Sequence, residues 1–208
     1  MRTMWPATAL VLFTVFALLG FGWRSWVQYR RTGSTGFRGL SGRFGSAEWF
    51  AGVGFVAALA TAVLAPMLQA VGVVTPLTDA GWLHGVGVVL AVAGIAATVY
   101  AQIDMGESWR IGVDQTETTT LVRGGVFGLV RNPIFTAMLI FGSGVALVTP
   151  NVIAVLGFAL LLGSIQLQVR VVEEPYLAAV HGAEYREYLA EVGRFVPRVG
   201  RRRTDSGG

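Results

Sequence analysis

Three polar residues at the far end of the longest apolar run could bind an ionic ligand. Arg170, Glu173 and Glu174 are spaced at i, i+3 and i+4, so they share one face if the helix continues past the run. Two adjacent carboxylates beside an arginine can hold a cationic group at a membrane boundary. The alternative, which these residues alone favour, is a structural ion pair or a capped helix start before Pro175.

A glycine-rich polar stretch at residues 104–133 could hold a cofactor by its main chain. Its glycines allow positive φ angles and close backbone approach. Pro133 is favoured in the first turn of a helix, whose free N–H groups would face the same side. The stretch could equally be an interfacial loop in which Trp109 is a headgroup anchor.

Two further segments could close such a pocket. Glycine occupies every third position from Gly33 to Gly45, which is typical either of a flexible loop that carries arginines to headgroups or of a loop that closes over a substrate. Near the C-terminus an amphipathic helix is predicted, with apolar positions at i, i+3, i+4 and i+7. These positions are Tyr185, Tyr188, Leu189 and Val192.

The composition indicates the class of protein in which these residues must be positioned. Of 208 residues, 53% are hydrophobic and 13% charged, whereas soluble domains carry roughly 25% charged residues. This excludes an ordinary cytosolic domain, a disordered chain and a nucleic-acid partner. There are no cysteines, and no His/Asp/Glu group has metal-ligand spacing, so we expect no thiolate chemistry and no metal site.

The apolar runs predict an all-α membrane protein with five spans. Three runs cover residues 3–23, 49–78 and 81–103. A fourth, residues 132–169, would be about 57 Å long as one helix, nearly twice the hydrocarbon core of about 30 Å. Thr149-Pro150-Asn151 is typical of a turn, so we divide this run into spans at 133–148 and 152–169.

The arginines predict the orientation of the chain. All sixteen basic residues are arginine, and fifteen follow the first, third or fifth span. The positive-inside rule then puts the N-terminus outside and the C-terminus in the cytosol. We expect the first run to be retained rather than cleaved, residues 1–198 to form one domain, and residues 199–208 to be a disordered basic tail. Arginine without lysine also suggests a GC-rich bacterial genome, and hence a bacterial plasma membrane.

Four motifs in order resemble the isoprenylcysteine carboxyl methyltransferase family and the related phospholipid methyltransferases. That family shares R-H-P-x-Y, a Glu-Glu pair, G-x-x-Y-x-x-Y and a closing R-F-x-P. The resemblance covers roughly residues 104–198. The matching segments here are Arg131-Asn132-Pro133-Ile134-Phe135, Glu173-Glu174, the stretch from Gly182 to Tyr188, and Arg194-Phe195-Val196-Pro197. Asn132 replaces the usual His and Phe135 the usual Tyr, and asparagine cannot shuttle a proton.

The resemblance implies S-adenosylmethionine (SAM) bound on the cytosolic side, between the loop before the fourth helix and the C-terminal helix. Arg170 would orient an anionic acceptor. The Glu173–Glu174 pair fits the methionine ammonium, since a carboxylate can pair with it, and Arg170 and Glu174 are the predicted catalytic residues. The residues implied in cofactor binding are Leu121, Val122, Gly124, Phe127, Arg131, Asn132, Pro133, Glu173, Glu174 and Tyr185.

The implied reaction is an SN2 methyl transfer from SAM to a lipophilic acceptor within the membrane, with S-adenosylhomocysteine (SAH) as product. The acceptor is a prenylcysteine-like carboxylate, a lipid or another small apolar molecule, and membrane lipids are partners. Two alternatives are an NADPH-dependent membrane reductase of the steroid 5α-reductase type and a non-catalytic scaffold. The clustered arginines would suit an NADP phosphate, whereas the near absence of ionisable groups inside the spans disfavours a transporter.

Overall fold

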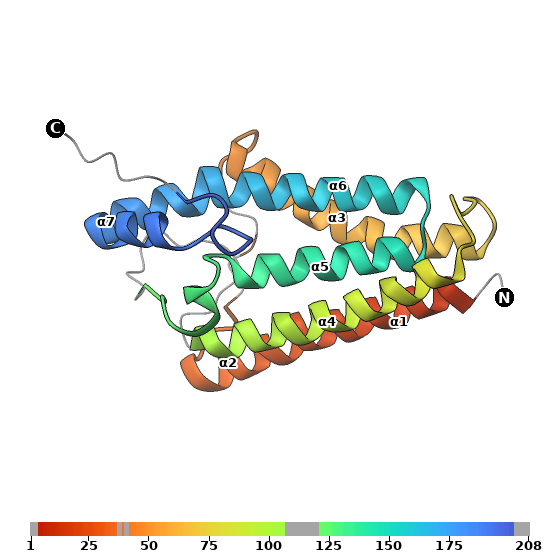
Figure 1. Cartoon of the computed structure of the whole chain (residues 1–208), viewed down its shortest axis with the longest axis horizontal. Helices are drawn as coiled ribbons and strands as arrows, with labels where there is room; N and C mark the ends of the chain where they lie inside the picture. The colour runs from red at the N-terminus through yellow and green to blue at the C-terminus, as the bar shows by residue number, and fades with distance from the viewer. Residues whose placement is uncertain (1–3, 37–38, 40–41, 107–120, 202–208) are drawn as a thin grey trace.

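The computed structural model describes residues 4–36, 39, 42–106 and 121–201, and these ranges form a bundle of helices (Figure 1). Apart from one isolated bridge between Val130 and Gly193, regular structure in the described ranges is helical. The elements in chain order are α1 (Met4–Ala17), η1 (Leu18–Trp23), α2 (Arg24–Thr32), α3 (Ala47–Ala70), α4 (Gly81–Met105), η3 (Gly125–Gly128), α5 (Pro133–Val148), α6 (Val152–Leu167), η4 (Gln168–Glu173) and α7 (Glu174–Glu191).

Four helical stretches within the described ranges are long and apolar enough to cross a membrane. They are Met4–Thr32, Ala47–Ala70, Gly81–Met105 and Val152–Glu191. The fifth apolar helix, α5, has only 16 residues and is shorter than a typical span. A five-span topology therefore stays a prediction. The predicted turn between the last two apolar helices is present, because α5 ends at Val148 and α6 begins at Val152.

Glycines explain where two helix ends differ from the predicted runs. The first helical stretch continues past Trp23 to Thr32, and Gly33, with φ +74°, ends it. The apolar run that reaches residue 78 extends beyond its helix, which ends at Ala70, just before Gly72 with φ +79°. A positive φ is readily adopted by glycine and rarely by other residues. Apolar composition alone therefore overestimated the length of this helix.

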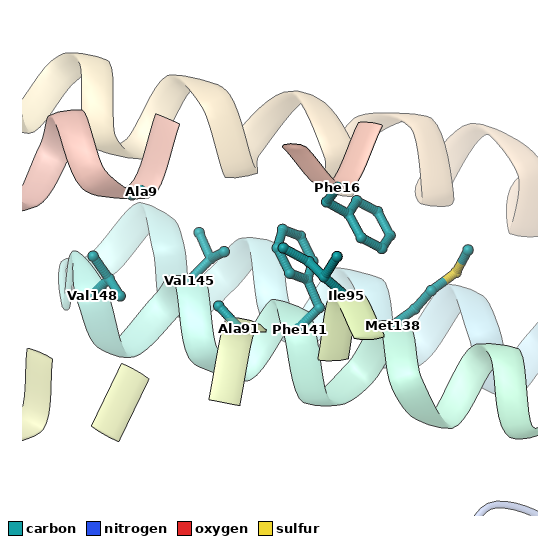
Figure 2. Packing of buried hydrophobic residues seen from close by; sticks show 8 residues of the cluster. All are labelled: Ala9, Phe16, Ala91, Ile95, Met138, Phe141, Val145 and Val148. Carbon is teal, nitrogen blue, oxygen red and sulfur yellow. The ribbon is translucent and has the colours of Figure 1, made fainter. Parts of the chain in front are cut away.

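The core lies where α5 packs against α1 and α4 (Figure 2). The rings of Phe16 and Phe141 stack with centroids 4.1 Å apart. The backbones of α4 and α5 approach so closely that a Cβ on Gly144 would lie 2.4 Å from the amide nitrogen of Ala91. The glycines in these apolar runs thus allow close helix packing, as membrane helices commonly require.

Hydrogen bonds connect the α5–α6 turn to the neighbouring helices at one end of the bundle. The Asn151 side chain accepts a bond from the Ala154 amide at 2.9 Å and donates one to Gln69 at 2.8 Å. The His84 ring lies 2.9 Å from the Val148 carbonyl and stacks on Trp5. These buried polar groups join α1, α3, α4 and the turn at one end of the molecule.

Two π-helical turns interrupt the long helices, η1 after α1 and η4 after α6. A π-helical turn inserts an extra residue, so it rotates the faces of the helix that follows. At η1 the fully buried Gln102 donates a bond of 2.9 Å to the Gly20 carbonyl, which fixes this turn against α4.

The last helix, α7, is folded back on itself at Gly182. This residue has φ +53° and ψ −117°, a conformation that strongly favours glycine. Tyr185, Tyr188, Leu189 and Val192 are buried in one cluster, against which Leu177 and Ala178 from the first half of α7 also pack. The predicted helical face is therefore covered largely by its own preceding segment.

The residues that follow α7 return to the bundle. The Arg194 amide donates to the Val199 carbonyl at 2.8 Å, and Arg131 donates to the Gly200 carbonyl at 3.3 Å. Two residues assigned to the predicted tail thus have defined contacts. Residues 202–208, with most of that tail, lie outside the described residues, as do residues 107–120 with Trp109.

Candidate functional site

A buried carboxylate joins three segments at the end of the bundle where α2 and α7 lie (Figure 1). Glu174, which is 3% exposed, accepts a bond of 2.9 Å from Arg131. Arg194 donates to both of its oxygens, through Nε at 2.7 Å and Nη2 at 2.8 Å. Such a bidentate, charge-assisted pair is strong and directional. We call Arg131, Glu174 and Arg194 the Arg–Glu–Arg cluster.

The π-helical turn η4 determines which side of the last helix faces this cluster. Glu174 follows η4 directly and points inward, whereas Arg170 within η4 is exposed and donates to Gln166 at 2.9 Å. The expectation that Arg170 and Glu174 share a face is wrong, because α-helical spacing does not apply across a π-helical turn. Glu173 is half-buried and accepts a bond from Gln168 at 3.4 Å.

Arg131 also holds the C-terminal segment in place. Its side chain donates to the carbonyls of Leu189, at 3.2 Å, and Val192, and its amide donates to the Gly193 carbonyl at 2.8 Å. Both the amide and the side-chain nitrogen of Asn132 donate to the Arg194 carbonyl, at 3.1 and 3.2 Å. The start of α5 and residues 192–194 thus form one rigid unit.

The cluster carries two guanidinium groups and one carboxylate, so one positive charge is in excess. The hydrogen bonds that Arg194 donates to Glu174 raise the pKa of its guanidinium above the usual value, against the opposing effect of burial. The contact with Glu174 therefore favours the charged form of Arg194. The excess charge favours an anionic group, such as a carboxylate, at the edge of the cluster.

The glycine-rich loop before α5 is held from two sides. On one side the Asp104 carboxylate accepts a bond of 2.9 Å from the Val126 amide. Gly125 has φ +56°, and a Cβ there would lie 2.1 Å from the Asp104 Oδ2, so a larger residue does not fit. On the other side the Tyr188 hydroxyl donates to the Phe127 carbonyl at 2.6 Å. The loop is thereby fixed between α4 and α7.

Arg123 adds a more exposed layer over this contact. Its guanidinium lies 5.5 Å from the centroid of the Tyr188 ring and 3.3 Å from Glu191. The Glu191 side chain is exposed and Arg123 is only half-buried, so the ion pair contributes little to stability. Arg123 nevertheless covers the ring of Tyr188, whose hydroxyl is bonded to the glycine-rich loop.

The structure brings together most of the residues that the sequence predicts for the site. Arg131, Asn132 and Glu174 meet at the cluster, and Pro133 starts α5 beside them. Leu121 packs against the buried cluster that contains Tyr185, and Phe127 accepts a hydrogen bond from Tyr188 of α7. Gly124 accepts the bond from the Phe127 amide at 3.1 Å, and Val122 lies in the same loop. Two predicted residues have their printed bonds outside the Arg–Glu–Arg cluster: Arg170 bonds Gln166 and Glu173 bonds Gln168.

Three residues with clear roles in this arrangement were not among those predicted. Arg194 was recognised only as part of a motif, Tyr188 only as part of a motif and as an apolar helix position, and Asp104 only as part of a loop. The bidentate contact of Arg194 spans 20 residues and the Asp104 contact spans 22. Such separations leave no trace in local spacing, so tertiary structure was needed to find these roles.

Comparisons with known proteins find one protein family and several relatives that are similar to this chain. The family described as phospholipid methyltransferase matches residues 82–184. Protein-S-isoprenylcysteine O-methyltransferase A of Arabidopsis thaliana is 28% identical over 120 residues, which cover 57% of this chain and 61% of that protein. A probable protein-S-isoprenylcysteine O-methyltransferase of Oryza sativa subsp. indica is 26% identical over 145 residues, covering 69% and 75%. The match to the Arabidopsis protein thus spans less than two thirds of its length.

The fold and the comparisons define a membrane protein built from apolar helices with a polar site at one end. They confirm the resemblance found in the sequence: the chain is similar to the phospholipid methyltransferase family and to the isoprenylcysteine O-methyltransferases of plants. The family match begins at residue 82, well before the first motif recognised in the sequence, and ends at residue 184, before Arg194.

Proposed function

We propose that the protein transfers a methyl group from SAM to a lipophilic acceptor in the membrane and releases SAH. The observation that carries this proposal is the buried Arg–Glu–Arg cluster, which gathers the glycine-rich loop, the start of α5 and the folded α7 at one end of an apolar bundle. Five membrane spans, an outside N-terminus and a site facing the cytosol of a bacterial cell belong to the same proposal.

The residues present fit such a cofactor. Gly124 and Gly125 offer main-chain groups in a loop without side-chain bulk, and the excess positive charge of the cluster suits the methionine carboxylate. Glu173, half-buried one residue before the cluster, is our candidate partner for the methionine ammonium. Glu174 has both oxygens bonded to arginines, so we assign it a positioning role in place of the predicted contact with the ammonium.

When bound, SAM supplies an electrophilic methyl group on a sulfonium. The protein's own contribution is then to orient the reactants and to exclude water, which in well-ordered systems lowers barriers by up to about 7–11 kcal/mol. Asn132 can donate a hydrogen bond but cannot take a proton. This favours a carboxylate acceptor, which needs no general base, and exposed Arg170 is placed to attract such a group from the membrane boundary.

Calorimetric titration of the detergent-purified protein tests the proposal. We expect SAM and SAH to bind with micromolar affinity and NADPH not to bind. The variant Glu173→Gln should weaken SAM binding about tenfold or more, because a charge-assisted contact is lost. The matched variant Glu187→Gln, at an exposed position of α7, should bind like the wild type.

The outcomes separate the possible functions. Binding of NADPH in place of SAM would refute methyl transfer and favour a reductase. Absence of all binding by a folded protein would indicate a non-catalytic member of the family. Once SAM binding is established, transfer of a radiolabelled methyl group into lipid extracts and into a prenylcysteine would identify the acceptor.

A further inference from the structure

The nine-residue helix α2 extends the first apolar helix beyond the thickness of a bilayer. The continuous stretch Met4–Thr32 has 29 residues and is therefore about 43 Å long. The hydrocarbon core measures about 30 Å. The excess of about 13 Å corresponds to roughly nine residues, the length of α2. This helix therefore lies at the level of the lipid headgroups.

Exposed aromatic rings and arginines lie close together on α2, with Trp26, Tyr29 and Arg30 on one face and Arg31 beside that face in the last turn. Trp26 and Tyr29 are 57% and 56% exposed, and Arg30 and Arg31 in the last turn are exposed as well. The Arg30 guanidinium lies 5.6 Å from the centroid of the Trp26 ring. A cation–π contact of this kind holds the guanidinium beside the ring. We call these four residues the α2 surface.

The sequence segment that contains α2 is mostly basic. Residues 18–50 contain five arginines and one acidic residue, Glu48. Exposed aromatic rings are typical of the interface between headgroups and acyl chains. Arginines at the same level attract anionic lipids, at about 1 kcal/mol each near an anionic surface. The complementary partner is therefore a phospholipid with a net negative headgroup.

A buried residue of α2 contacts the elements that hold the candidate site. Arg24, which is buried, donates a bond of 2.5 Å to the Gly106 carbonyl directly after α4. Two residues earlier, Asp104 accepts the bond from Val126 that fixes the glycine-rich loop. A ligand that holds α2 in place would therefore also hold the end of α4 to which this loop is attached.

We propose that the α2 surface binds the headgroup of an anionic phospholipid, with Arg30 and Arg31 at the phosphate and Trp26 and Tyr29 at the glycerol level. Through Arg24 and Gly106 the bound lipid steadies Asp104 and the glycine-rich loop. This second, regulatory part rests on the proposed methyltransferase function, whereas lipid binding does not.

Native mass spectrometry of the full chain in detergent tests the lipid site. The protein is titrated with dioleoyl-phosphatidylglycerol or with dioleoyl-phosphatidylcholine, which have the same acyl chains. We expect preferential retention of phosphatidylglycerol, and we expect the double variant Arg30→Gln/Arg31→Gln to reduce this preference roughly tenfold. The control double variant Arg186→Gln/Arg201→Gln removes the same charge from exposed positions elsewhere and should retain the preference.

Equal retention of the two lipids by the wild type, or equal loss of preference in both double variants, would overturn the lipid site.

The regulatory part is tested by measuring SAM affinity in nanodiscs with and without phosphatidylglycerol. We expect the lipid to strengthen SAM binding severalfold in the wild type and to have no effect in Arg30→Gln/Arg31→Gln. If the wild type binds SAM equally in both nanodiscs, the regulatory part is refuted.

If SAM does not bind in any condition, the proposed methyltransferase function fails. The retention of phosphatidylglycerol in native mass spectrometry then still shows whether the α2 surface binds an anionic lipid.

Discussion

Glu174 is the residue through which the C-terminal segments of the site are joined. Its carboxylate contacts one arginine before α5 and another after α7, and both arginines also bond backbone groups of neighbouring segments. The Arg131 side chain is 1% exposed, so its charge has little water to stabilise it. Removal of one partner from a buried ion pair costs more than the pair contributes, because the remaining charge is left uncompensated.

We therefore expect Glu174→Gln to lower the free energy of unfolding by about 3–5 kcal/mol. A thermal unfolding scan in detergent would measure this as a clear loss of melting temperature. The same scan of Glu187→Gln, whose side chain is exposed on α7, should match the wild type. A melting temperature of Glu174→Gln equal to that of the wild type would contradict the buried cluster.

Tyr188 gives a second prediction at this scale. Its hydroxyl donates to the carbonyl of the buried Phe127, so Tyr188→Phe leaves that carbonyl without this bond at a cost of about 1–3 kcal/mol. The loop should loosen, and SAM affinity measured by calorimetry should fall while the fold, followed by circular dichroism, is kept. Tyr100→Phe, at an exposed position on α4, serves as control. Unchanged SAM affinity in Tyr188→Phe would refute the link between this bond and the site.

At the scale of elements, departures from regular helix bring the site together. The π-helical turn η4 turns Glu174 inward and leaves Arg170 outside, and Gly182 reverses the chain so that Arg194 reaches Glu174. A regular helix from Val152 to Glu191 would carry these residues far from one another. The close contact of α4 and α5 in turn fixes the position at which α5 begins, and with it Arg131 and Asn132.

Replacement of Gly182 by alanine should strain this reversal. At φ +53° and ψ −117° a Cβ is unfavourable, and we expect a loss of about 1–3 kcal/mol in the free energy of unfolding. Gly163→Ala on α6, where a Cβ meets no atom within 4 Å, should leave stability unchanged or slightly higher. Denaturation of both variants in the same detergent compares them, and equal stabilities would argue against the reversal at Gly182.

A methyl group at the α4–α5 contact should separate the two helices. The Cβ of Gly144→Ala would lie 2.4 Å from the Ala91 nitrogen and 2.7 Å from the Gly87 oxygen, both backbone atoms. We expect a loss of about 1–3 kcal/mol in stability, measured by thermal unfolding. Gly85→Ala, with open space around its Cβ on α4, is the matched substitution. If the two variants melt alike, the close packing of α4 and α5 is wrong.

For the whole molecule, the proposed topology can be tested by cysteine labelling, since the natural chain has no cysteine. Val73, which is exposed between α3 and α4, and Arg186, which is exposed on α7, lie on opposite sides of the membrane in this proposal. In intact bacterial cells or spheroplasts we expect a membrane-impermeant maleimide to label Val73→Cys and to label Arg186→Cys only after permeabilisation. The reverse pattern, or labelling of both from outside, would refute the orientation.

The sequence by itself determined the helical class, the apolar stretches, the turn at Thr149-Pro150-Asn151 and the segments that carry the polar motifs. These follow from hydropathy and from proline and glycine, which act over a few residues. Only the tertiary structure decided which charges meet. The Arg131–Glu174 contact joins residues 43 apart, and the Glu174–Arg194 contact joins residues 20 apart. The inward position of Glu174 also depends on a π-helical turn, which regular 3.6-residue spacing does not predict.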